Sequence, residues 1–157
     1  MEPYRPVATV QQIMDAMVDP SADFLWEAVA TISTAAGIEE RQPRTDDEWK
    51  AVRNRALTLA EAANLLVMTR AVGQPGEPTV EGVELPPDQI SARITADRAT
   101  WNALALGLQD AVQPALQAIE RRDALALQSA GEGIDVACEN CHQKYWYPNQ
   151  PTGPPGQ

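Results

Sequence analysis

Apolar side chains recur at intervals of three and four residues along most of the chain, and this spacing predicts helices. A first helical region is expected over residues 6–36. Asp19-Pro20 interrupts it, because Asp is a good N-cap and Pro is favoured in a first helical turn. We therefore expect a bend there and a second helical piece from residue 21. The apolar positions of this region are Val10, Ile13, Met14, Met17, Leu25, Ala28, Val29, Ile32 and Ala36.

Three further helices are expected downstream. The second covers about 46–72, behind a predicted N-cap at Thr45. The third starts near Asp88 and continues through Pro114, where a kink is expected, to a turn at 121–123. The fourth covers about 123–146. The expected buried stripes of the second and third helices are Trp49, Val52, Ala56, Leu59, Ala63 and Leu66, and Trp101, Leu104, Leu108, Val112, Ala115 and Ile119.

Two segments rich in Pro and Gly separate or follow these helices. Residues 73–87 hold four Pro and three Gly, which predicts a long loop, and residues 148–157 hold four Pro and two Gly, which predicts an extended, mobile tail. No run alternates apolar and polar residues in the manner of a strand. The sequence thus predicts one domain over residues 1–147 with an all-α fold, an antiparallel four-helix bundle. Gly131 and Gly133 in the fourth helix would permit close approach of a neighbour.

Composition narrows the classes of function. The 157 residues are 44% hydrophobic, enough for a core, and carry a formal net charge of −10. Such a charge argues against a nucleic-acid binder and fits a partner with a basic patch. No apolar run reaches the roughly 20 residues of a membrane span. The stretch MEPYRPVATV lacks the features of a secretory signal.

The stretch CENCH, residues 138–142, contains both cysteines of the chain and its single histidine. On a helix, Cys138 and His142 share a face and Cys141 lies at its edge. Two thiols at this spacing can add to the two vinyl groups of a haem, and the adjacent imidazole can reach the iron. C-x-x-C-H is the attachment signature of c-type haem.

Three other interpretations of CENCH stay open. A structural zinc site needs about four ligands, and a carboxylate would have to join the three present. A thioredoxin-like redox pair is typical of a strand-helix context, and no strands are expected. The third interpretation is a structural helical bundle with a disulfide or two free thiols, which leaves the coincidence of Cys, Cys and His unexplained.

With C-x-x-C-H on its last helix, the helical pattern resembles the class II cytochromes c, the cytochrome c′ and cytochrome c-556 group, over about residues 7–147. The resemblance implies one covalent haem c, with thioethers at Cys138 and Cys141 and with His142 as the proximal iron ligand. It also implies a periplasmic protein whose signal peptide has been removed. A homodimer formed through the first two helices is compatible with it.

The family resemblance also suggests the distal ligand. Aligning Gln11 with the corresponding family position places Met14 at the ligand position, with Met17 one turn later as the alternative. A His/Met haem implies low-spin iron that transfers electrons to a redox partner protein, and no enzymatic turnover. The alternative is a five-coordinate, cytochrome c′-like protein that binds NO or CO, in which Met14 or Met17 is a steric gate.

Aromatic and charged residues near the motif complete the expected site. Tyr145 is expected to pack on the haem edge, and Trp146 and Tyr147 to cover the site at the helix end. The sequence departs from the family at two positions where a basic residue is common, Gln11 and Trp146, so the propionate partners stay open, with Lys144 a candidate. The other tryptophans, Trp26, Trp49 and Trp101, are expected in the core.

Overall fold

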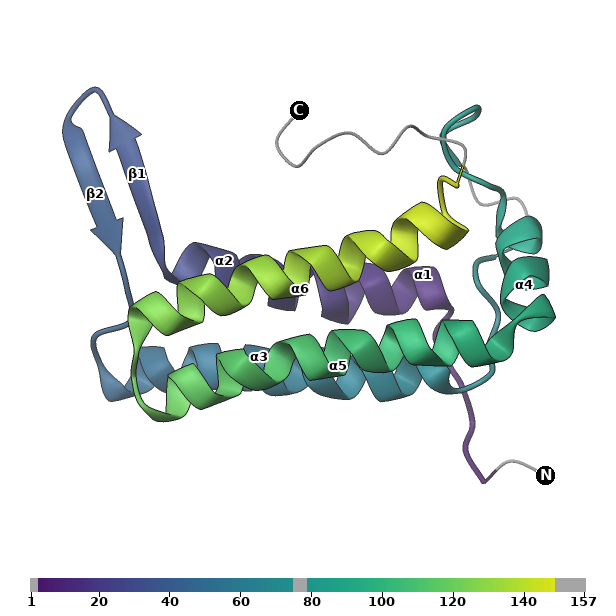
Figure 1. Ribbon diagram of the computed structural model, residues 1–157, viewed down its shortest axis with the longest axis horizontal. Coiled ribbons are helices and arrows are strands. Elements are labelled where there is room, and N and C mark those ends of the chain that lie inside the picture. The colour runs from purple at the N-terminus through teal and green to yellow at the C-terminus, as the bar shows by residue number, and fades with distance from the viewer. Residues whose placement is uncertain (1–2, 75–78, 149–157) are drawn as a thin grey trace.

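The long helices of the protein lie side by side in a computed structural model, which describes residues 3–74 and 79–148 (Figure 1). The N-terminal helical segment contacts α3 and α6, α3 contacts α5, and α5 contacts α6. Neighbours in this arrangement run in opposite directions (Figure 1). The helices are α1 (Val10–Ile13), the π-helix η1 (Met14–Val18), α2 (Asp19–Ala28), α3 (Asp46–Val67), α4 (Pro87–Ala96), α5 (Arg98–Glu120) and α6 (Ala124–Tyr145).

The core forms where the predicted apolar stripes meet. All six predicted positions of α3 are buried, and so are five of the six on α5, with Leu104 partly exposed. Helix α3 begins at the capping box predicted behind Thr45, whose side chain accepts from the N–H of Glu48 while the Glu48 carboxylate accepts from the N–H of Thr45. The predicted helices at 46–72 and 123–146 are thus confirmed to within a few residues.

In place of the bend expected at residues 19–20, the structure has a π-helical turn just before them. The backbone stays helical through Asp19, and α2 begins at Asp19, two residues before the predicted start. Just before it, η1 is a turn of π-helix in which the N–H of Asp19 donates to the carbonyl of Met14. Pro20 has no N–H, and its ring crowds the carbonyl four residues earlier, so a wider turn admits the proline without ending the helix.

The prediction of helix as far as residue 36, and of a fold without strands, was wrong. Helix α2 ends at Ala28, and the strands β1 (Ala30–Thr34) and β2 (Gly37–Arg41) form an antiparallel hairpin that stands away from the helices (Figure 1). The stretch from Val29 to Thr34 is rich in β-branched residues, which favour strands. Gly37 then adopts a φ of 127°, which a residue with a side chain rarely adopts.

The predicted third helix is two helices. Asp97 leaves the helical region with φ −145° and ψ 70°, and its carboxylate accepts from the backbone N–H and the hydroxyl of Thr100. Asp97 thereby ends α4 and caps α5, which crosses Pro114 without stopping.

The fold is therefore mostly helical, with one small two-stranded sheet. The predicted tail lies outside the described residues except for Pro148. Among the residues that the structure does describe, no helix is both long and apolar enough to cross a membrane.

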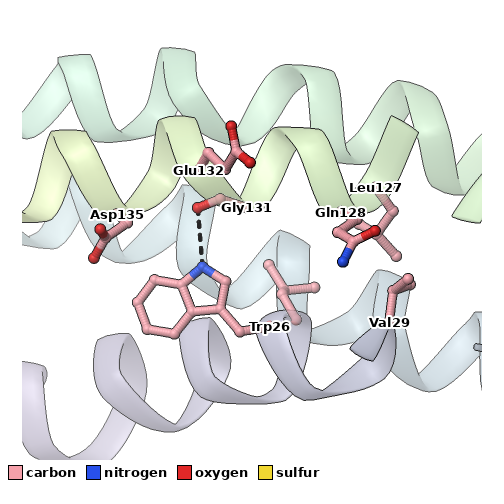
Figure 2. A pocket seen from close by; sticks show the side chains of 8 residues that line it. Trp26, Val29, Leu127, Gln128, Gly131, Glu132 and Asp135 are labelled. Carbon is pink, nitrogen blue, oxygen red and sulfur yellow. Dashed lines mark hydrogen bonds between the residues drawn. The ribbon is translucent and has the colours of Figure 1, made fainter. Parts of the chain in front are cut away.

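Helices α2 and α6 approach each other closely at Gly131. The indole N–H of Trp26 donates to the carbonyl of Gly131 at 2.9 Å (Figure 2). A Cβ atom on Gly131 would lie 2.9 Å from Cδ1 of Trp26, whereas one on Gly133 would meet nothing within 4 Å. The predicted role of glycine in close approach is confirmed for Gly131 only. Trp26 itself is 36% exposed, so its predicted place in the core was wrong.

Gly131 and Gly133 provide a matched pair for testing this contact. Gly133→Ala should raise the free energy of unfolding by about 0.5–1 kcal/mol, since alanine is the better helix former. Gly131→Ala should be at least about 1 kcal/mol less stable than Gly133→Ala, because its methyl group displaces the Trp26 ring. Urea denaturation of both variants measures the difference. Equal stability would contradict the close approach.

Candidate functional site

The CENCH stretch lies in the last two turns of α6. Cys138 and Cys141 are half-buried against the core and do not form a disulfide. Burial is the main cause of the high pKa of both thiols, which is raised to about 11 for Cys138 and to about 12 for Cys141. Thiols in this state are mostly protonated at neutral pH and react slowly with electrophiles.

The structure brings His142 and Met14 to one cavity. This cavity has a volume of about 440 Å³ and lies between the N-terminal helical segment and the end of α6. His142 is half-buried, as is Met14. A histidine and a methionine from two distant parts of the chain thus line the same cavity. The other residues that line this cavity are Gln11, Asp15, Asp19, Glu84, Trp146 and Tyr147.

The two predicted distal ligands differ in their position. Met14 begins the π-helical turn and lines the cavity beside His142. Met17 is half-buried in the same turn but does not line this cavity, and it packs against the core. π-Helical turns occur often at functional sites, because they re-aim side chains relative to an α-helix. Both methionines lie in this turn, and Met14 is the one that shares the cavity with His142.

Aromatic packing fixes the end of α6. Trp101 of α5 is 1% exposed, and its indole N–H donates to the carbonyl of Leu66 at 2.7 Å. Its ring packs edge-on against Tyr145, with 5.1 Å between centroids, and stacks on Trp146 at 6.2 Å. The N–H of Leu85 donates to the carbonyl of Trp146 at 2.7 Å. These contacts hold the turn that follows His142.

The aromatic residues predicted around the site lie in two different environments. Trp146 and Tyr147 line the cavity, with ring centroids 5.9 Å and 6.0 Å from that of His142, as expected of residues that cover the helix end. Tyr145 points into the core instead and does not line the cavity. Its hydroxyl is buried and has no hydrogen-bond partner among the described residues. Packing of Tyr145 on a haem stays a prediction.

Carboxylates give the cavity a negative field. Asp19 is exposed to solvent, but partial desolvation by its neighbours raises the pKa of its carboxyl; His142 acts in the opposite direction, and Asp15 adds to the rise. The hydroxyl of Tyr147 donates to the carboxylate of Glu139. Burial, together with this bond, raises the pKa of Tyr147. Lys144, the candidate propionate partner, is exposed and does not line the cavity.

Three acidic residues at the cavity were absent from the predicted site. Asp15 and Asp19 lie one and five residues after Met14, so their place near that side chain was open to prediction from helical spacing. Glu84 belongs to the loop before α4, and no local pattern in the sequence connects this loop with His142.

Histidine and methionine are the iron ligands of many cytochromes, and His142 and Met14 would suit such a group. Cys138 and Cys141 do not line the cavity that these two residues share. A zinc site needs about four ligands. Within the described parts of the chain, no group of three or more His, Cys, Asp or Glu side chains is arranged to hold a metal ion.

Comparisons of the chain with protein-family models, with curated proteins and with solved structures found no match.

The raised thiol pKa values predict slow alkylation of the folded protein. Against an ordinary value of 9.0, a pKa of about 11 lowers the thiolate fraction of Cys138 at pH 8 about 100-fold. Iodoacetamide should therefore modify the folded protein at least about 100-fold more slowly than the protein in urea. The folded-state rate should rise about tenfold per pH unit up to about pH 11. A folded-state rate that levels off near pH 9 would show that neither thiol is held neutral.

Proposed function

We propose that the protein is a monohaem c-type cytochrome that transfers electrons. Haem c would be attached to Cys138 and Cys141, with its iron held by His142 and Met14. The observation that carries this proposal is the shared cavity: the histidine of C-x-x-C-H and a methionine from the first helical segment face the same space. We further propose that the helices form the antiparallel four-helix bundle of the class II cytochromes c.

The residues of the chain have separate tasks in this proposal. Haem iron supplies one-electron chemistry when the group is bound. Cys138 and Cys141 tether the group, while His142 and Met14 provide a nitrogen and a sulfur ligand that suit both oxidation states. Trp146 and Tyr147 cover the His142 side and limit the entry of water. None of these residues turns over a substrate, so we propose no enzymatic activity.

The proposed attachment of haem c also has a consequence for the cellular location of the protein. Thiols with a raised pKa are mostly protonated, so few thiolates are present for covalent attachment at Cys138 and Cys141 in the folded chain. We propose a periplasmic location, as in the bacterial family that the sequence resembles.

Optical spectra with methionine variants test the proposed ligands. The protein is co-expressed with haem-c maturation factors, and spectra are recorded oxidised and reduced, with and without CO. The wild type should be low-spin, show the weak Met–iron band and give the same spectrum with and without CO. Met14→Ala should lose that band and bind CO, whereas the matched variant Met17→Ala should keep the wild-type spectrum, because Met17 does not line the cavity.

Two results would contradict parts of the proposal. A high-spin wild type that binds CO would reject Met14 as a ligand and favour a cytochrome c′-like protein that binds NO or CO. A chain that acquires no covalent haem stain under conditions that mature a control cytochrome would reject the haem itself. Cys138→Ala combined with Cys141→Ala should abolish that stain in any case.

A further inference from the structure

Six carboxylates flank the line along which the N-terminal helical segment packs against α6. Asp15 and Asp19 line one cavity with His142 of α6, and Glu132 and Asp135 line another with Trp26 of α2. Five of the six are exposed, and Glu139 is half-buried. We call this surface the acidic seam. Its members are Asp15, Asp19 and Asp23 on η1 and α2, and Glu132, Asp135 and Glu139 on α6.

No basic residue neutralises the acidic seam within its own helices. Residues 6–40 and 123–143 contain no Lys or Arg, so the first cation on α6 is Lys144. The ion pairs found in the described residues, Arg41 with Glu39 and Arg122 with Asp46, lie elsewhere. Asp15, Asp19 and Asp23 follow one another at intervals of four residues, where like charges destabilise a helix. This arrangement of like charges lowers the stability of the fold, so its presence needs an explanation other than stability.

A cavity with a half-exposed tryptophan interrupts the acidic seam. It has a volume of about 390 Å³ and is lined by Trp26 of α2 and by Glu132 and Asp135 of α6, among others (Figure 2). Trp26 is 36% exposed, whereas Trp49, Trp101 and Trp146 are at most 9% exposed. Its N–H bond to Gly131 holds the ring in place. Rigid aromatic side chains of this kind are frequent anchors of protein interfaces, and they also attract Lys and Arg.

The basic residues of the chain lie mainly on other elements. Helix α3 carries Lys50, Arg53 and Arg55, and the turn after α5 carries Arg121 and Arg122. Arg55 reaches the Phe24 ring of α2 at 5.4 Å, and the seam's own helices carry no Lys or Arg before Lys144. A negative surface field guides a basic protein toward one face before contact.

We propose that the acidic seam, with Trp26 as its aromatic anchor, is the docking surface for a protein partner that presents Lys and Arg side chains. The partner's role rests on the proposed function: Asp15 and Asp19 also line the His142 cavity, so a docked protein lies next to the proposed haem and can exchange electrons with it. Docking itself depends only on residues of this chain.

Charge variants of the haem-loaded, full-length chain test the docking surface. The probe is mitochondrial cytochrome c, a basic protein, titrated by calorimetry at low and at physiological salt. The seam variant combines Asp23→Asn, Glu132→Gln and Asp135→Asn, none of which lines the His142 cavity. The matched control combines Glu61→Gln, Asp110→Asn and Glu120→Gln on α3 and α5, with the same change in net charge.

The seam variant should bind the probe about tenfold more weakly at low salt, and the control within about twofold of the wild type. Trp26→Leu should also weaken binding but leave its salt dependence unchanged, since no charge is removed. Circular dichroism confirms that each variant is folded. Equal weakening by the seam variant and the control, or no binding by the wild type at low salt, would overturn the proposal. Displacement of the probe by spermidine at equal concentration would also overturn it, in favour of a small polyamine as the occupant.

Failure of docking and failure of the haem proposal give different results. Seam-dependent binding by a chain that acquires no haem would leave the docking surface in place and reject the electron-transfer function. A normal low-spin spectrum, together with probe binding that is equally strong in the wild type and the seam variant, would support the haem and reject the docking surface.

Discussion

The position of the candidate site depends on the packing of Trp101. This one side chain of α5 donates to the backbone at the end of α3, through Leu66, and contacts two rings at the end of α6. One of those rings belongs to Trp146, whose backbone N–H donates to the backbone carbonyl of His142 at 2.8 Å. A shift of Trp146 would therefore move His142. Packing of the hydrophobic core thus sets the position of His142.

The facing wall of the cavity is fixed by a different constraint. Pro20 cannot join a regular α-helix without crowding the turn before it, and the chain responds with the wide π-helical turn that begins at Met14. At the start of that segment, the N–H groups of Val10 and Gln11 donate to the carbonyls of Ala71 and Val72. Backbone geometry at both ends thus sets the place of Met14, while side-chain packing sets that of His142.

The parts of this structure that the sequence predicts best are those in which one local pattern decides the outcome. Helix α3 has a capping box and six regularly spaced apolar residues, and CENCH brings its three chemical groups together in five residues. The hairpin at 30–41 was missed because its apolar residues also match a helical period, and β-branched content together with the turn at Gly37 decided against the helix. The break at Asp97 follows from one capping side chain within an otherwise periodic run.

Contacts between distant segments were harder to predict. Apolar character placed Trp26 in the core, yet its hydrogen bond to Gly131 leaves the ring half-exposed beside α6. Glu84 reaches the His142 cavity because Leu85 is tied to the carbonyl of Trp146, a contact between loop and helix end that spacing alone does not reveal. The residues proposed as iron ligands, and the carboxylates of Asp15 and Asp19 beside Met14, were therefore open to prediction, whereas Glu84 was not.

The α3–α5 interface and the α2–α6 interface contribute differently to the stability of the fold. Where α3 and α5 pack together, small side chains permit close approach, and that interface contributes stability through dense packing. The α2–α6 side carries like charges without counter-ions, a half-exposed tryptophan and a glycine in the middle of a helix, each of which lowers stability. The alanines of α3 and α5 that are fully buried are Ala56, Ala62, Ala63, Ala115 and Ala118.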